Sequence, residues 1–215
     1  MKFSIIDIEN WERKTHFDYY RNTVKCAYSL TAFLNITKFK KMLEVKGIKF
    51  FPAFVYCVSK LIKQTKEFRM GLNEDEKPGY YDCMHPNYTI FHKDDNTFSD
   101  LWTEYDDEFN VFYHNMLSDI SIYKNVKGIK VKDGQPKNFY CISCVPWLSF
   151  TGYSTSTPAG TPNLFPIITY GKYQKKDGKL MMPFSVNISH AAADGYHTSK
   201  FINDLQIMLD KIILG

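Results

Sequence analysis

The stretch Leu180-Met-Met-Pro-Phe-Ser-Val-Asn-Ile-Ser-His-Ala-Ala-Ala-Asp-Gly195 shows the fold most clearly. Apolar and polar residues alternate up to residue 188, which predicts a strand over residues 180–188. Three alanines follow His190 and leave space around its ring. After Gly195 the apolar residues recur at helical spacing and predict a C-terminal helix. The segment therefore predicts a strand, turn and helix corner from which His190 can reach a pocket.

Further strands and helices are interspersed along the chain. Strands are predicted over residues 28–36, 87–92, 139–145 and 165–173, with a hairpin over residues 68–83. Helices are predicted from Thr37 to Gly47 and from Pro52 to Thr65. Thr103 is predicted to cap another helix, and Asp177-Gly178 to form a tight hairpin turn. Residues 149–162 are rich in Ser, Thr, Pro and Gly and predict a loop.

The length of 215 residues fits one domain, and no repeat or flexible linker divides the chain. We therefore expect a single domain spanning residues 1–215. The order of its elements predicts the α/β (α+β) class, with a mixed-sheet sandwich flanked by helices.

Charge and composition exclude several classes of function. The 27 Lys and Arg against 23 Asp and Glu give a net charge of +4, and the basic residues are scattered, which argues against nucleic-acid binding. The longest strongly apolar stretch, residues 50–58, is far shorter than the roughly 20 residues of a membrane span. The N-terminus has no signal-peptide pattern. Five cysteines without scaffold spacing fit reduced thiols, so we expect a cytoplasmic protein that binds no membrane.

No convincing metal site emerges from the sequence. Cys141 and Cys144 are three residues apart in a predicted strand, so their side chains point to opposite faces. His92 to Asp95 fits a solvated turn better than a ligand set. We therefore expect no bound metal.

His190 and Asp194 are the strongest candidates for chemistry. A histidine suits general-base catalysis because its pKa lies near working pH, although the ring could equally pack beneath the last helix. Asp194, if buried, requires a cation, and Arg13 in the N-terminal segment suits a buried carboxylate. The alternative is that Asp194 only caps the C-terminal helix.

The motif His190-Ala-Ala-Ala-Asp194-Gly195 resembles the signature of the chloramphenicol acetyltransferase family, which the dihydrolipoyl acyltransferases share. Other blocks that resemble this family follow in order from about residue 6 to residue 206. They include Asn10-Trp-Glu-Arg-Lys-Thr-His-Phe-Asp-Tyr-Tyr20, Tyr28-Ser-Leu-Thr31, Lys49-Phe-Phe-Pro52, Val145-Pro-Trp147 and Asp194-Gly-Tyr-His197.

The resemblance implies a homotrimer with sites at subunit interfaces, acetyl-CoA as co-substrate, chloramphenicol as acceptor and no metal. It implies that His190 is the general base, that Ser143 stabilises the oxyanion, and that Thr169 holds the intermediate through water. Arg13 and Asp194 match a structural ion pair of the family. Positions matching the antibiotic pocket are Tyr20, Val24, Cys26, Thr89 and Phe98. Positions matching the coenzyme A site are Lys49, Lys172 and Tyr173.

The sequence departs from the family pattern at three places, of which the last, a loop, helps shape the acceptor pocket in the family. Ser189 replaces the first of two usual histidines, Cys141 replaces a common Asn, and residues 150–156 differ from the usual loop. Two alternatives therefore remain beside chloramphenicol acetylation. One is an acyltransferase of the same fold with another hydroxyl acceptor, and the other is a non-catalytic protein that sequesters the drug.

Overall fold

A seven-stranded mixed sheet forms the centre of the computed structural model, which describes residues 2–156 and 163–215. The strand order is β2-β10-β8-β7-β5-β6, and β9 pairs with the outer part of β10. β7 is parallel to both β5 and β8, whereas the other pairs are antiparallel. The strands are β2 (Ala27–Asn35), β5 (His85–His92), β6 (Thr97–Trp102), β7 (Phe139–Val145), β8 (Ile167–Gly171), β9 (Gln174–Lys176) and β10 (Lys179–Ser189).

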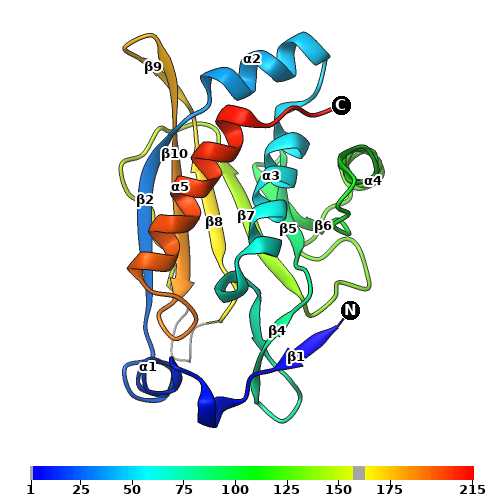
Figure 1. Cartoon of the computed structure of the whole chain (residues 1–215). Helices are drawn as coiled ribbons and strands as arrows, with labels where there is room; N and C mark the ends of the chain where they lie inside the picture. Colours follow the sequence, from blue (N-terminus) through cyan, green and yellow to red (C-terminus); the bar gives the residue numbers. More distant parts are fainter. Residues whose placement is uncertain (1, 157–162) are drawn as a thin grey trace.

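Helices cover one face of this sheet (Figure 1). The longest are α3 (Phe50–Gln64), α4 (Phe109–Tyr123) and α5 (Gly195–Lys211), with α2 (Thr37–Lys46) above them. Phe54 of α3 packs its ring 5.0 Å from that of Tyr170 and 6.1 Å from that of Phe184. These contacts place the main hydrophobic core between sheet and helices. The α/β fold class with a mixed sheet is thereby confirmed.

A second, smaller sheet lies at the other end of the molecule from α2 (Figure 1). It consists of β1 (Phe3–Ile5), β4 (Pro78–Tyr81) and β3 (Met70–Leu72) in that order. Near it run η1 (Ile8–Asn10), α1 (Lys14–Asp18), η2 (Tyr19–Thr23) and η3 (Lys66–Arg69). Within the described ranges, no helix combines the length and the apolar character that crossing a bilayer requires.

Alternation along the strands gives the main sheet two different faces. Ile142, Ile168 and Phe184 point toward the helices and are buried. Their neighbours Ser143 and Thr169 point to the opposite face, because successive side chains of a strand alternate. The fold thus presents a polar strip of the sheet on the side away from α3 and α5.

Several local predictions are confirmed and others are wrong. Asp177 and Gly178 have φ values of 49° and 74°, as the predicted hairpin turn requires. Thr103 caps no helix; its buried hydroxyl bonds to Tyr88 and to Asp119 of α4, which begins six residues later. The strand β6 was not predicted. Of the loop predicted at residues 149–162, residues 157–162 lie outside the described residues.

Candidate active site

His190 directly follows the last residue of β10, and its ring is held by aromatic neighbours. The Tyr20 ring stacks on the imidazole at 3.7 Å between centroids and 6° between planes. The Tyr28 ring lies 5.1 Å away. The backbone N–H of His190 donates to the carbonyl of Cys26 at 3.0 Å. Nδ1 is buried without a hydrogen-bond partner among the described residues, which leaves Nε2 as the nitrogen available for proton transfer.

The alanines that follow His190 are required by the packing of the turn. Ala191, Ala192 and Ala193 are at most 1% exposed. Their backbone N–H groups all donate to Ser189: Ala192 and Ala193 to its carbonyl at 3.0 and 3.1 Å, and Ala191 to its hydroxyl at 3.3 Å. Ser189, one of the departures from the family pattern, therefore anchors the turn that carries the histidine.

Asp194 serves as both a helix cap and an ion-pair partner. Its Oδ2 accepts from Arg13 Nη1 at 2.6 Å, and its Oδ1 accepts from the backbone N–H of Tyr196 at the start of α5. Burial opposes ionisation of this carboxyl, but the hydrogen bonds and charges of Arg13 and His197 outweigh it and lower the pKa of Asp194. The two interpretations of Asp194 that the sequence left open are thus compatible.

Two residues that the sequence did not single out complete this network. His197 Nδ1 lies 2.8 Å from Asp194 Oδ1, and its Nε2 lies 3.7 Å from Glu67 Oε1 in η3. His197 also completes a capping box, because it lies three residues after the cap Asp194 and its side chain accepts from the backbone N–H of Asp194. The spacing Asp194-Gly-Tyr-His197 could have indicated this contact. Glu67 could not have been found, because only the fold brings η3 beside α5.

Ser143 and Thr169 lie in a row of hydroxyl groups across the polar face of the sheet. Ser143 pairs with Thr169 between β7 and β8, and Thr169 pairs with Ser185 on β10. Ser143 Oγ is 3.0 Å from Thr89 Oγ1, and Thr31 Oγ1 donates to Ser185 Oγ at 3.0 Å. Thr31 and Ser185 donate within the fold, to Ser185 and to the Tyr153 carbonyl, so Ser143, Thr89 and Thr169 are the hydroxyls of this row that can serve a bound group.

The predicted base and the predicted oxyanion donor are far apart within one chain. Ser185 is level with Thr169, and His190 is the fifth residue after Ser185 along the extended chain. At ~3.3 Å per residue, that separation is roughly 16 Å along β10. Ser143 lies a further two strands away. A reacting atom would have to lie about 3 Å from both groups, so one copy of the chain does not bring them together.

The residues predicted to line the acceptor pocket fall into the same two groups. Tyr20, Val24 and Cys26 lie in or just after η2, beside His190. Thr89 and Phe98 lie on β5 and β6, with Ser143. Phe98 is 49% exposed, and Val24 is 42% exposed. Each group leaves apolar surface open beside polar catalytic candidates.

The residues predicted to lie near coenzyme A gather at the end of the molecule that carries α2. Lys49 precedes α3, and its backbone N–H donates to Tyr113 Oη at 2.9 Å. Lys172 and Tyr173 follow β8, and the backbone N–H of Lys172 donates to the Leu148 carbonyl at 2.9 Å. Lys40 Nζ lies 5.7 Å from the centre of the Tyr173 ring.

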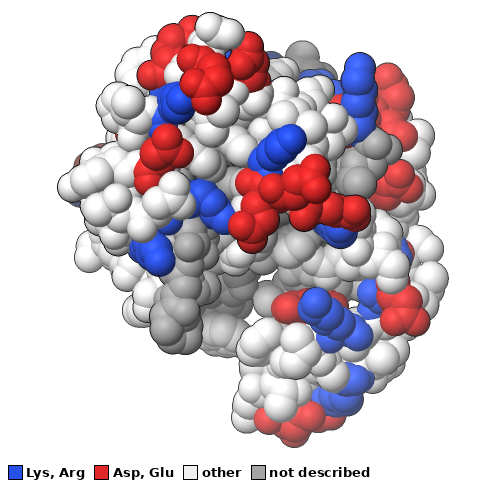
Figure 2. Space-filling model, turned by 90° about the horizontal axis from the view of Figure 1, so that it is seen from below, with Lys and Arg blue, Asp and Glu red and all other residues white. Residues whose placement is uncertain are grey.

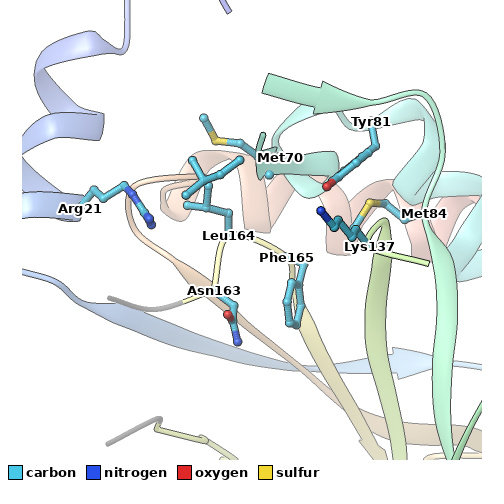
Figure 3. Close-up of a pocket in the computed structure, with 10 residues that line it drawn as sticks. Arg21, Met70, Tyr81, Met84, Lys137, Asn163, Leu164 and Phe165 are labelled. Atoms are coloured by element: carbon cyan, nitrogen blue, oxygen red, sulfur yellow. The ribbon is translucent and has the colours of Figure 1, made fainter. Parts of the chain in front are cut away.

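A separate pocket of about 190 Å³ lies between η2, the small sheet and the residues before β8 (Figure 3). Arg21 reaches toward it from one side, and Lys137 and Tyr81 lie on the other. None of the sequence-predicted site residues lines it. Burial lowers the pKa of Arg21, against a smaller opposing effect of Glu76.

In the part of the chain that the structure describes, no group of three or more His, Cys, Asp or Glu side chains is arranged to hold a metal ion. Cys141 faces the polar side of the sheet, and burial raises the pKa of its thiol to about 12. His85 is buried, and its Nδ1 accepts from the backbone N–H of Tyr105.

Comparison with solved structures places the fold among the acetyltransferases. A chloramphenicol acetyltransferase structure superposes with a TM-score of 0.83 at 26% identity, over 97% of this chain and all of the other. The dihydrolipoamide acetyltransferase of Azotobacter vinelandii shares the fold, with a TM-score of 0.64 at 16% identity over 92% of this chain and 86% of its own.

The sequence comparison is more specific. A chloramphenicol acetyltransferase of Clostridium perfringens is 44% identical over 206 residues, which cover 96% of this chain and 94% of that protein. The family model for chloramphenicol acetyltransferase matches residues 1–206. The chain therefore belongs to the chloramphenicol acetyltransferase family.

Proposed function

We propose that this protein transfers the acetyl group of acetyl-CoA to a hydroxyl group of chloramphenicol and so inactivates the antibiotic. The observation that carries the proposal is the family match over residues 1–206, a span that contains His190, Ser143 and Thr169. The proposal treats residues 1–215 as one acyltransferase domain. It also places the enzyme in the cytoplasm, in keeping with five cysteines that are all free.

In the proposed reaction His190 acts as the general base. Its Nε2 removes the proton of the acceptor hydroxyl, and the oxygen attacks the thioester carbonyl carbon, forming the C–O bond. Ser143 donates a hydrogen bond to the resulting oxyanion, and Thr169 supports it through a water molecule. The C–S bond then breaks, and the coenzyme A thiolate takes the proton back from His190. Stacking on Tyr20 orients the imidazole for both proton transfers.

The reaction further requires two copies of the chain. His190 and Ser143 are too far apart within one copy, so we propose that His190 of one copy meets the hydroxyl row of a neighbour. The same arrangement joins the two halves of the acceptor pocket. We propose the homotrimer that the family resemblance implies as the closed assembly with this interface.

Release of the coenzyme A thiol on adding chloramphenicol tests the chemistry. We expect turnover by the unchanged protein, and a loss of about 100-fold or more in kcat for both His190→Ala and Ser143→Ala. Equal rates for His190→Ala and the unchanged protein would refute the mechanism. Tight chloramphenicol binding without thiol release would instead identify a protein that sequesters the drug.

One observation favours another hydroxyl acceptor as the second candidate. The altered loop, residues 150–156, rests on the polar face: Ser185 Oγ donates to the Tyr153 carbonyl at 2.9 Å, and Asn187 Nδ2 donates to the Thr155 carbonyl at 3.1 Å. The Thr155 hydroxyl is buried without a partner among the described residues. An acceptor with a further polar group would satisfy it, so a panel of hydroxyl compounds in the same assay discriminates between the two functions.

A further inference from the structure

Basic residues that are scattered along the sequence are gathered by the fold at one end of the molecule. Residues 37–49, which include α2, hold five lysines and Glu44. Residues 171–179, which include β9 and the hairpin turn, hold four lysines and Asp177. We call the nine the lysine cluster: Lys38, Lys40, Lys41, Lys46, Lys49, Lys172, Lys175, Lys176 and Lys179.

The two segments of the lysine cluster are in direct contact. The backbone N–H of Leu180, next to the hairpin, donates to Thr37 Oγ1 at the start of α2, at 2.8 Å. Lys40 of α2 lies over the ring of Tyr173. Figure 1 shows β9 and α2 side by side at the top of the molecule. The hairpin lysines at 172, 175, 176 and 179 are all exposed.

The charge of the molecule is therefore strongly asymmetric. Nine lysines against Glu44 and Asp177 give these two segments a net charge of +7, whereas the whole chain carries +4. The remainder of the chain is consequently acidic. Figure 2 shows the opposite end, seen from below, where acidic and basic side chains are interspersed. A multiply charged anion would be drawn to the end that carries α2 and the hairpin.

Two members of the lysine cluster, Lys49 and Lys172, are predicted to lie near coenzyme A together with Tyr173; the other seven members are the outer lysines. We propose that the outer lysines of the cluster steer the polyanionic coenzyme A thioester into its site; this inference rests on the proposed function. Coenzyme A carries a diphosphate and a 3′-phosphate, or roughly four negative charges. The outer lysines act at a distance on association, without a fixed contact to the ligand.

The physical effect expected is on association rate and not on the chemical step. A single exposed lysine contributes little through a surface ion pair. Several like charges around one entrance add their long-range potentials, however, and raise the association rate of an oppositely charged ligand by about 10-fold or more at low salt. The Debye length is about 10 Å at 0.1 M salt, so the attraction weakens steeply as salt is added.

The test compares two variants of equal net charge. Lys175→Gln, Lys176→Gln and Lys179→Gln are combined in one variant. Lys2→Gln, Lys66→Gln and Lys124→Gln, which remove three exposed lysines elsewhere, are combined in the control. The steady-state kcat/KM for acetyl-CoA is measured between about 0.02 and 0.5 M salt, along with the melting temperature and the oligomeric state of each variant.

We expect kcat/KM of the unchanged protein to fall about 10-fold across this range. The hairpin variant should be about 3- to 10-fold lower at low salt, converge with the unchanged protein at high salt, and keep its kcat. The control should follow the unchanged protein, and 3′-dephospho-acetyl-CoA should show a weaker salt dependence. Equal losses in both variants, or turnover that salt does not affect, would overturn the steering. Absence of turnover at every salt concentration would overturn the proposed function and this inference with it.

Discussion

Asp194 joins the N-terminus of α5 to Arg13, and its substitution gives a pH-dependent prediction. Asp194→Asn removes the charge but keeps the shape of the cap. We expect it to lower the free energy of unfolding by about 1–3 kcal/mol at pH 7, because the Arg13 guanidinium, 16% exposed, loses its carboxylate partner. Urea unfolding at several pH values measures the loss.

The sign of the pH dependence follows from the pKa of Asp194, which is lower in the folded protein than its ordinary value of 3.8. The stabilisation is therefore complete above about pH 4 and is lost as the pH falls through the folded pKa. The difference between Asp194→Asn and the unchanged protein should shrink on acidification. Asp133→Asn, at an exposed site without an ion pair to any described residue, is the control; a difference that persists unchanged at pH 2.5 would contradict the pairing of Asp194 with Arg13.

Two cysteines with a raised thiol pKa give a second prediction for single residues; Cys57 is fully buried and Cys141 is partly exposed. Burial raises the pKa of Cys57 and of Cys141 to about 12, so little thiolate is present at neutral pH. We expect iodoacetamide at pH 8 to leave both unmodified in the folded protein and to alkylate all five cysteines in urea. Peptide mass spectrometry measures the modification. Rapid alkylation of native Cys141 would contradict the raised pKa of its thiol.

At the residue scale, sequence reasoning found groups that belong to a local motif. The spacing within residues 190–195 was enough to single out His190 and Asp194, and the need of a buried carboxylate for a cation pointed to Arg13. Glu67 was missed because its position beside His197 depends on how η3 packs against α5. Contacts between distant segments leave no spacing signal in a single sequence.

The end of β8 gives a prediction at the scale of elements. A Cβ atom at Gly171 would lie 2.7 Å from the Leu148 carbonyl oxygen and 2.8 Å from both the Phe150 ring and Pro183. Since backbone is among the atoms met, Gly171→Ala must displace the segment that follows β7. We expect a loss of about 1–3 kcal/mol in stability and a higher KM for acetyl-CoA, because Lys172 is held by the same carbonyl.

Gly152→Ala is the matched control, because no atom of the described residues lies within 4 Å of a Cβ atom at Gly152. Denaturant unfolding and steady-state kinetics distinguish the two substitutions. Unaltered stability and KM in Gly171→Ala would mean that the loop after β7 is not fixed against β8.

Elements with strong local signals were predicted correctly, and those defined by tertiary contacts were not. The Asp177-Gly178 turn follows from the positive φ that these two residues tolerate. Thr103 has the right chemistry for a helix cap, but its hydroxyl is used by Tyr88 and Asp119, so α4 begins only at Phe109. The short strand β1 depends on pairing with β4, a partner 74 or more residues away.

At the scale of the whole molecule, the periodicity of the sequence does not predict that His190 and the hydroxyl row lie far apart within one chain. Each residue is well placed in its own element, and only the strand register shows that His190 and the hydroxyl row are apart. The proposed assembly of the site across two copies rests on this geometry. In that proposal, the open apolar surface beside each half-site is the surface that meets the neighbouring copy.

Mixing two inactive variants tests that assembly directly. His190→Ala keeps the hydroxyl row, and Ser143→Ala keeps the base. If one copy supplies His190 and its neighbour supplies Ser143, then co-refolding equal amounts restores an intact pair at about one quarter of the sites, because each of the two contributions is intact with a chance of one half. Thiol release should recover to about a quarter of the unchanged rate, with sedimentation reporting the number of copies in the assembly.

Each variant refolded alone is the control. If the mixture stays as inactive as the controls although mixed assemblies form, each site is built within a single chain, and the distance along β10 must be closed by a rearrangement of that chain.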